Sequence, residues 1–186
     1  MRVIGGKWRG HRLADLSDKV LSSQLRPTMD RVRETTFNIL AHGLFFELDG
    51  VRVLDLFCGT GSLGFEALSR GAKHCCFIDI APMSLRIVNE NTSLLKANNE
   101  VTILKQDATN LTQNVGDGYD LIFLDPPYGK GFGALALKIA IKRGWVSTEA
   151  VVIWEERDEV ALPDELNLIR RKPIGNVCLN FFRRSH

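Results

Sequence analysis

The chain lacks the sequence patterns of a membrane protein, a disulfide-stabilised secreted protein and a zinc protein. No apolar run approaches the ~18 residues that a membrane-spanning helix needs, and residues 1–7 contain no apolar signal-peptide core. The four cysteines form no C-x-x-C pair, and none lies at ligand spacing from a histidine. We therefore expect no disulfide framework, no metal and no membrane partner, and a location in the reducing cytoplasm.

Charge of one sign is not in large excess either. The 24 basic and 22 acidic residues leave a formal net charge of +2, so composition alone indicates no nucleic-acid partner. The distribution is uneven, however. Residues 1–37 contain eight basic and four acidic side chains, and residues 170–186 contain five basic and no acidic ones. Two basic ends favour a nucleic-acid-binding role over the alternative of ordinary solvated charge.

Residues 51–71 have the pattern of a strand, a tight turn and a helix that together bind a ligand. The apolar run 53–57 predicts a buried strand, and Gly59, Gly61 and Gly64 follow where a helix should begin. Glycine allows positive φ angles and lets a ligand approach the backbone closely. The first N–H groups of the following helix lack intrahelical partners, so a ligand with hydrogen-bond acceptors should lie at this turn.

Two acidic residues indicate which ligand this is. Asp79 lies twenty positions after Gly59, at the end of the next apolar run, where a carboxylate can accept both hydroxyls of a ribose. Asp55 lies four positions before Gly59, near the mouth of the same turn, where it would repel the pyrophosphate of NAD. S-adenosylmethionine (AdoMet) has an ammonium and a sulfonium group instead. Asp55 therefore favours AdoMet, although the glycine pattern alone allows NAD.

A second motif, Asp125-Pro126-Pro127-Tyr128, follows an apolar strand at the sheet edge where α/β proteins bind ligands. The prolines have fixed φ angles and no N–H groups, so the Pro126 carbonyl is a rigid acceptor. Together with the Asp125 carboxylate, it can accept both N–H groups of an exocyclic amine and stabilise the positive charge that grows during methyl transfer. We expect Tyr128 to stack on the target base, which must be extruded or single-stranded. These four residues are the candidate catalytic residues.

From residue 51 onward strands and helices alternate, which predicts a doubly wound, Rossmann-like α/β fold with a mostly parallel sheet. We expect strands at 51–57, 74–80, 101–105, 119–124 and 150–155, helices at 62–70, 82–97, 108–115 and 133–142, and a C-terminal hairpin at 166–172 and 177–183 that adds an antiparallel strand. Before this domain of residues 49–186, residues 1–48 form a basic appendage. We expect it to contain a β-hairpin within residues 2–13 and a helix capped by Thr28.

The chain resembles the class I AdoMet-dependent amino-methyltransferases in Val53-Leu-Asp-Leu-Phe-Cys-Gly-Thr-Gly-Ser-Leu-Gly64 and in Asp125-Pro-Pro-Tyr128. Its amino-terminal segment, Met1-Arg-Val-Ile-Gly-Gly-Lys-Trp-Arg-Gly10 and Leu25-Arg-Pro-Thr-Met-Asp-Arg-Val-Arg-Glu-Thr-Thr-Phe-Asn-Ile-Leu40, is similar to that of the bacterial 16S ribosomal RNA guanine-N2 methyltransferases of the RsmD type. The resemblance covers nearly the whole chain. One departure is Cys58, because an alanine often precedes the glycine at this position.

This resemblance implies transfer of a methyl group from AdoMet to the exocyclic N2 of a guanine in 16S rRNA. We expect a monomer that acts on a small-subunit particle; free 16S RNA as the substrate, the identity of the guanine and the oligomeric state stay open from the sequence. The resemblance also implies that Gly59 and Gly61 contact the methionine part of AdoMet, Asp79 the ribose and Asp107 the adenine amine. The predicted cofactor-binding residues are Asp55, Phe57, Gly59, Thr60, Gly61, Asp79, Ile80, Asp107, Ala108 and Asp125. The predicted RNA-binding residues are Lys7, Arg9, Arg26, Arg31 and Arg33.

Other functions remain open from the sequence. An enzyme with the same fold could methylate N6 of adenine in DNA or RNA, or a glutamine amide, because the Asp-Pro-Pro-Tyr motif does not specify the base. The short chain argues against a DNA enzyme, which would need a separate domain for sequence readout. An NAD-dependent oxidoreductase and a catalytically inactive RNA-binding factor are further alternatives.

Overall fold

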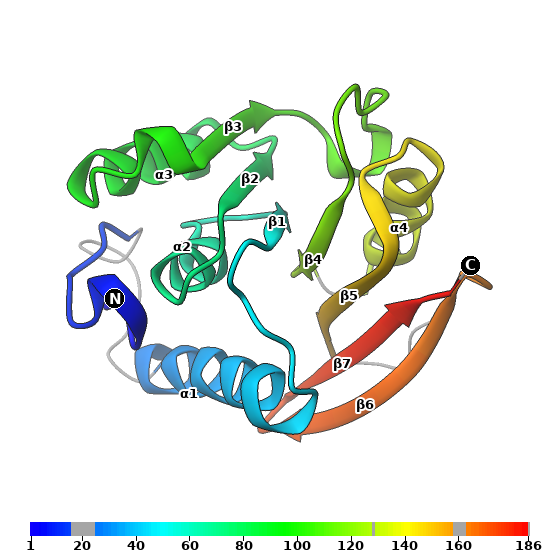
Figure 1. Cartoon of the computed structure of the whole chain (residues 1–186), viewed down its shortest axis with the longest axis horizontal. Coiled ribbons are helices and arrows are strands. Elements are labelled where there is room, and N and C mark those ends of the chain that lie inside the picture. Colours follow the sequence, from blue (N-terminus) through cyan, green and yellow to red (C-terminus); the bar gives the residue numbers. More distant parts are fainter. Residues whose placement is uncertain (16–24, 128, 158–162, 186) are drawn as a thin grey trace.

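A seven-stranded β-sheet forms the centre of the protein (Figure 1). The computed structural model describes residues 1–15, 25–127, 129–157 and 163–185, with residues 25–29 described by their backbone alone. The strands are β1 (Arg52–Leu56), β2 (His74–Asp79), β3 (Val101–Lys105), β4 (Tyr119–Leu124), β5 (Val146–Glu156), β6 (Leu166–Ile174) and β7 (Val177–Arg184). Their order across the sheet is β3-β2-β1-β4-β5-β7-β6.

The first five strands pair in parallel, whereas β7 is antiparallel to β5 and β6 is antiparallel to β7. This confirms the predicted doubly wound, mostly parallel sheet with an antiparallel strand from the C-terminal hairpin. The strand order reverses between β1 and β4. Open α/β sheets leave a crevice for ligands at the carboxyl ends of the strands at such a point.

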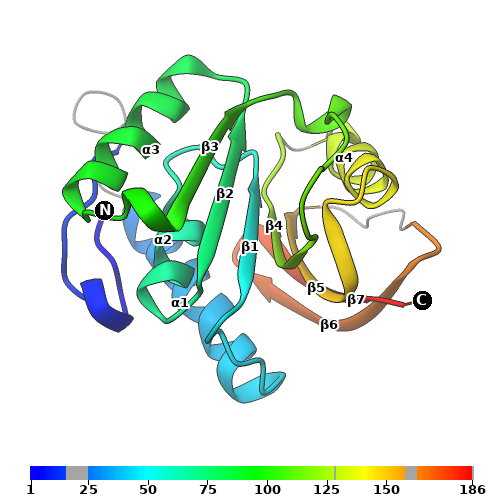
Figure 2. The ribbon, with the colours of Figure 1, turned by 45° about the horizontal axis from the view of Figure 1, so that its top comes forward.

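Helices cover both faces of the sheet (Figure 2). They are α1 (Leu25–Asn38), its π-helical continuation η3 (Ile39–Gly43), α2 (Ser62–Ser69), α3 (Pro82–Leu94) and α4 (Phe132–Lys142), with short 3-10 turns at η1 (Gly6–Trp8), η4 (Asn98–Glu100) and η5 (Ala108–Asn110). The helices α1, α2 and α3 lie on one face, and α4 lies on the other. Within the described ranges, no helix is both long and apolar enough to cross a bilayer.

Successive side chains of each strand point to opposite faces of the sheet, and this produces two hydrophobic cores. Val53 of β1 belongs to the cluster that contains Phe37 of α1 and Phe65 of α2, whereas the next residue, Leu54, belongs to the cluster with Leu137 of α4. The central strands are therefore buried on both faces, which explains why the sequence shows continuous apolar runs rather than alternation. The two cores hold the carboxyl ends of β1, β2 and β4 in place.

The two amino-terminal segments predicted to form a β-hairpin do pair in antiparallel fashion, but over a shorter length than predicted. Arg2 and Arg12 form an antiparallel bridge, the Val3 N–H donates to the His11 carbonyl at 3.0 Å, and the Leu13 N–H donates to the Met1 carbonyl at 3.0 Å, with the η1 turn between the two segments. The N–H groups of Ile4 and Gly5 donate to the buried carboxylate of Glu66 on α2, each at 2.8 Å. These two donors therefore lie beyond the paired residues and are satisfied by α2 instead of by a longer hairpin.

The first helix begins earlier than predicted. α1 starts at Leu25, three residues before the expected cap at Thr28. Pro27 therefore lies in the first turn, where the missing N–H removes no intrahelical hydrogen bond. The expected boundary between residues 48 and 49 stays a prediction, and the two parts share a core, since Val3 and Leu13 are buried in the same cluster as the sheet.

The helix predicted at residues 108–115 is reduced to the short η5 turn. The Asp107 carboxylate accepts the Thr109 N–H at 2.8 Å, and the Gln106 side chain accepts the Thr112 N–H at 3.1 Å. The Asp107 bond is an N-cap and does not shorten the helix, whereas the Gln106 side chain takes the Thr112 N–H that a longer helix would have used.

Candidate active site

The turn between β1 and α2 has positive φ angles at Phe57 (57°), Gly59 (53°) and Gly61 (75°). Phenylalanine rarely adopts this conformation, and such strain is concentrated at functional sites. A Cβ added at Gly59 would meet no atom within 4 Å, whereas one at Gly64 would lie 2.3 Å from the Phe77 ring. Gly64 therefore lets α2 pack closely on β2, and Gly59 leaves backbone open to a ligand.

Asp79, at the end of β2, connects that strand to the glycine turn. Its Oδ2 accepts the Gly59 N–H at 2.9 Å, and its Oδ1 accepts the Ala81 N–H at 2.8 Å. Each carboxylate oxygen can accept a second hydrogen bond. Capacity therefore remains for the two hydroxyls of a ribose, so this geometry is compatible with the predicted role of Asp79.

Asn91 of α3 is a second organiser of the turn, and it was not predicted. Its side chain is fully buried, and its Nδ2 donates to the Thr60 carbonyl at 3.2 Å and to the Ala14 carbonyl at 3.1 Å. Its Oδ1 accepts the Ala14 N–H at 2.7 Å. The sequence did contain a signal, because Asn91 lies at helical spacing from Val88 and Leu95 on the apolar face of α3.

Asp55 lies beneath the turn rather than at its mouth. It is 3% exposed, and its Oδ2 accepts the Gly64 N–H at 3.1 Å. Burial raises the pKa of Asp55 well above its ordinary value; the Gly64 hydrogen bond opposes this rise, and the charges of Asp125 and Asp79 add to it. The carboxyl group holds the first turn of α2, and its predicted contact with a cofactor stays a prediction.

A cavity of about 750 Å³ opens at the carboxyl ends of the central strands. It is lined by Phe57, Asp79, Ile80, Ala81, Asp107, Thr109, Asp125, Pro126, Pro127 and Phe132. Three of these residues are acidic, and none of the described lining residues is basic. The volume is within the range of about 300–1,000 Å³ that is usual for ligand pockets.

Asp125 directly follows β4, whose last residue, Leu124, pairs with Trp154 of β5. Partial removal from water raises the pKa of Asp125 to about 8, and the charges of Glu155 and Glu156 on β5 add to the rise. Asp125 is nevertheless exposed to the solvent of the cavity, which screens these charges and reduces the effect. A cation bound in the cavity would restore the ionised form.

The cavity brings together most, but not all, of the predicted site residues. Those that line it are Phe57, Asp79, Ile80, Asp107, Asp125, Pro126 and Pro127. Those that do not are Asp55, Gly59, Thr60, Gly61 and Ala108. Tyr128 lies outside the described residues, so its stacking role stays a prediction. Ala81, Thr109 and Phe132 line the cavity without having been predicted, because no motif marks them.

The predicted RNA-binding residues have different environments. Arg33 is 3% exposed, and its Nη2 donates to the Arg2 carbonyl and to Asp30, so the expectation that it faces RNA does not fit its position. Arg9 and Arg31 are exposed. Lys7 pairs with Glu100 and lies over the Trp8 ring. The side chain of Arg26 lies outside the described part of the chain.

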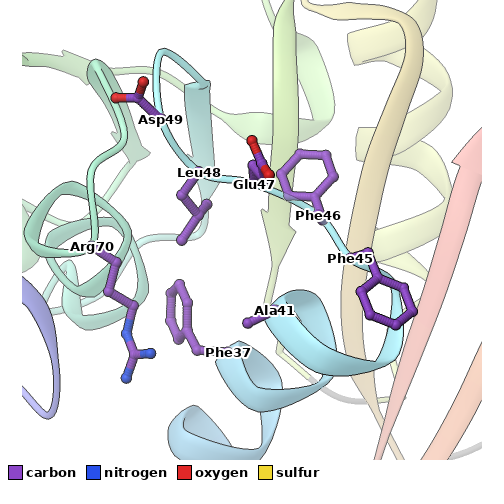
Figure 3. Close-up of a pocket in the computed structure, with 8 residues that line it drawn as sticks. All are labelled: Phe37, Ala41, Phe45, Phe46, Glu47, Leu48, Asp49 and Arg70. Carbon is purple, nitrogen blue, oxygen red and sulfur yellow. The ribbon is translucent and has the colours of Figure 1, made fainter.

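A second hollow, of about 470 Å³, lies near the amino-terminal end of β1, away from the acidic cavity at the carboxyl ends of the strands (Figure 3). Its lining is Phe37, Ala41, Phe45, Phe46, Glu47, Leu48, Asp49 and Arg70. The Arg70 guanidinium lies 4.9 Å from the centroid of the Phe37 ring. No predicted catalytic or cofactor-binding residue lies there, so the acidic cavity is the candidate active site.

The sequence and the fold were compared with known proteins. The family model described as "Conserved hypothetical protein 95" matches residues 1–183. "Ribosomal RNA small subunit methyltransferase D" of Escherichia coli (strain K12) is 34% identical, over 100% of this chain and 90% of the relative. The solved structure "Putative methyltransferase yhhF from Escherichia coli" has a TM-score of 0.84 at 29% identity, and the match covers 100% of this chain and 98% of that one.

A more distant structure shares the fold. Magnesium protoporphyrin IX methyltransferase (ChlM) from Synechocystis PCC 6803, solved with bound SAM, has a TM-score of 0.69 at 16% identity. The match covers 92% of this chain and 87% of that one. The Rossmann-like fold expected from the sequence is therefore the fold of known methyltransferases.

Proposed function

The chain belongs to the family described as Conserved hypothetical protein 95, and from this premise we propose that it is an rRNA methyltransferase with AdoMet as its methyl donor. The full-length similarity to ribosomal RNA small subunit methyltransferase D supports an rRNA substrate. The Asp-Pro-Pro-Tyr motif at residues 125–128 supports transfer to an exocyclic amine. We assign N2 of a guanine in the 16S rRNA of the small ribosomal subunit as the acceptor.

The central observation is the charge of the cavity, which has three acidic and no basic residues in its described lining. Carboxylates that lie close together favour a cationic ligand, because an opposite charge within a few ångström stabilises their ionised forms. AdoMet has an ammonium and a sulfonium group. The pyrophosphate of NAD would meet like charge here, so the site favours a methyl donor over a dinucleotide.

The residues present also fit AdoMet by their chemistry. Asp79 would accept the ribose hydroxyls, Asp107 the adenine amine, and the open backbone at Gly59 would contact the methionine part. Ile80 is 62% exposed and Phe132 is 37% exposed, so both offer apolar surface on the cavity wall to a flat ring. When bound, AdoMet would supply a methyl group that is activated by the positive charge on its sulfur, and the remainder of the cofactor would leave as the thioether S-adenosylhomocysteine.

Asp125 and Pro126 act on the acceptor. An exocyclic amine is a weak nucleophile, because its lone pair is delocalised into the base. The Asp125 carboxylate and the Pro126 carbonyl would accept its two N–H groups and stabilise the positive charge that develops on the nitrogen. The base must be extruded to reach them. Alignment of the two reactants in this rigid site supplies a large part of the rate.

The test is methyl transfer from labelled AdoMet to 30S particles, 16S RNA, DNA and a release factor, each in a separate reaction. We expect label in the particle or in 16S RNA, and N2-methylguanine in the digested RNA by mass spectrometry. Label in adenine or in glutamine, or no transfer to any substrate, contradicts the proposal. Calorimetry should show binding of AdoMet and not of NAD.

A further inference from the structure

A polar groove of about 330 Å³ lies between the C-terminal part of α1, the η3 turn and the edge strand β6. Figures 1 and 2 both show the end of α1 beside the end of β6. We call it the α1–β6 groove, and its polar lining is Thr35, Asn38, His42, Arg170 and Lys172. It belongs neither to the acidic cavity nor to the second hollow beside Phe37 and Arg70.

The sheet register directs two basic side chains into this groove. Arg170 pairs with Phe181, and Lys172 pairs with Leu179. Phe181 and Leu179 are buried in the core on the α1 face of the sheet, and paired residues on neighbouring strands point to the same face. Arg170 reaches across to η3, since a Cβ added at Gly43 would lie 2.8 Å from its Nη1.

The opposite wall of the groove is one face of α1. Thr35, Asn38 and His42 recur at intervals of three and four residues, which is the spacing of a single helix face. Arg31 lies one turn before Thr35 on the same face, and it is exposed. The groove therefore continues along the face of α1 that carries Arg31, which the sequence predicts to bind RNA.

The chemistry of the lining suits a polyanion. Arg170 and Lys172 are exposed, and neither has an ion pair with another described residue. The helix side adds a hydroxyl, an amide and an imidazole, and no described lining residue is acidic. Exposed, separated donors of this kind suit a chain of phosphates better than one enclosed anion, which would need buried donors.

One end of the groove, at Lys172, lies level with Asp125 of the candidate active site, and Arg170 lies two residues away, in the row of Phe123. Asp125 follows the Leu124–Trp154 pair, and the next row across the sheet runs through Glu155 and Leu179 to Lys172. Three strand spacings separate the two ends of this row, which is about 14 Å. A single RNA strand can span that distance in a few nucleotides.

We propose that the α1–β6 groove binds the sugar–phosphate backbone of the substrate RNA beside the nucleotide that enters the acidic cavity. This inference rests on the proposed function, because it takes the substrate to be RNA. It assigns a role to the basic segment that begins at Arg170, which the proposed chemistry does not use.

The experiment measures the affinity of the full-length protein for 16S RNA as a function of salt. The double variant Arg170→Gln/Lys172→Gln is compared with Lys138→Gln/Lys142→Gln, which removes two exposed lysines from α4 on the other face of the sheet. Each lost phosphate contact on a single strand should reduce the slope of log K against log salt by about 0.7. We expect a reduction of about 1.4 in the groove variant, none in the control, and unchanged AdoMet affinity in both.

Three outcomes would overturn the proposal: an unchanged slope and affinity in the groove variant, an equal loss in the control, and a loss of binding to polyglutamate while RNA binding is unchanged. The last outcome would indicate an acidic protein segment as the ligand. The outcome for the proposed function can be distinguished from the outcome for the groove. If no RNA is methylated but the groove variant still loses RNA affinity, the groove binds RNA and the assigned reaction is wrong.

Discussion

The acidic cavity and the α1–β6 groove are two polar depressions of opposite charge, and they are built differently. Two acids of the cavity, Asp79 and Asp125, lie at the ends of the buried strands β2 and β4, and Asp79 is held by two backbone N–H groups. The bases of the groove, Arg170 and Lys172, project from an exposed edge strand. This difference fits the two proposed ligands, because a small cationic cofactor needs acceptors fixed by rigid backbone, whereas a polyanion needs only charge of the right sign along its path.

The largest expected effect is on catalysis in the cavity. Asp125→Ala should lower kcat by about 10²–10³-fold, because one preorganised partner of the developing charge is lost. AdoMet affinity, measured by calorimetry, should change little. Asp107→Asn is the matched variant, and it should weaken AdoMet binding more than it lowers kcat. If Asp125→Ala abolishes AdoMet binding instead, the two roles are assigned the wrong way round.

The second effect separates two arginines of α1 that are two residues apart. Arg33 is buried against Glu66, with 3.6 Å between its Nε and Glu66 Oε2, whereas Arg31 is exposed. Arg33→Ala should lower the free energy of unfolding by about 3 kcal/mol, because it leaves a buried carboxylate short of a partner.

Arg31→Ala is the control for that prediction. It should change the free energy of unfolding by no more than about 0.5 kcal/mol and should weaken RNA binding. Urea denaturation of both variants measures the first quantity. Equal stabilities would show that burial does not distinguish the two side chains.

The third effect compares the stability cost of adding a methyl group at a tightly packed glycine with the cost at a glycine whose neighbour can move aside. Gly64→Ala places a Cβ 2.3 Å from the Phe77 ring, inside the packed turn, and overpacking of this kind costs about 1–3 kcal/mol. Gly43→Ala places a Cβ 2.8 Å from the free end of Arg170, which can move aside, so its cost should stay below about 0.5 kcal/mol. Urea denaturation compares the two, and a larger loss for Gly43→Ala would reverse the distinction.

The smallest effect concerns pH. Removal from water and the charges of Glu155 and Glu156 raise the pKa of Asp125. The ionised carboxylate is the form that accepts the amine N–H groups, so kcat/KM should fall as the pH decreases through this pKa. Glu155→Gln removes one like charge and should move the acidic limb of the pH profile to lower pH. Glu90→Gln, on the exposed side of α3, should leave the profile unchanged. Superimposable profiles for Glu155→Gln and the unaltered protein would contradict this coupling.

Much of the fold was predictable, because its elements depend on local patterns. The apolar runs that became β1, β2, β3 and β4 and the glycines of the first turn are visible along the chain. The contacts of Asn91 were not, since they connect α3 to Thr60 and to Ala14, 31 and 77 residues away. The short length of the amino-terminal pairing was not predictable for a similar reason, because Glu66 takes the N–H groups of Ile4 and Gly5.

The amino-acid sequence by itself determined the alternation of strands and helices, the positive-φ glycines of the first turn and the position of the Asp-Pro-Pro-Tyr motif after β4, because periodicity and turn chemistry act over a few residues. Only the tertiary structure decided which charged side chains are buried and which face solvent. It placed Arg33 inside and Arg31 outside, put Asp55 beneath the turn, and brought β6 against α1. The physical reason is that burial and charge pairing depend on the distances between segments far apart in the chain, which no local pattern encodes.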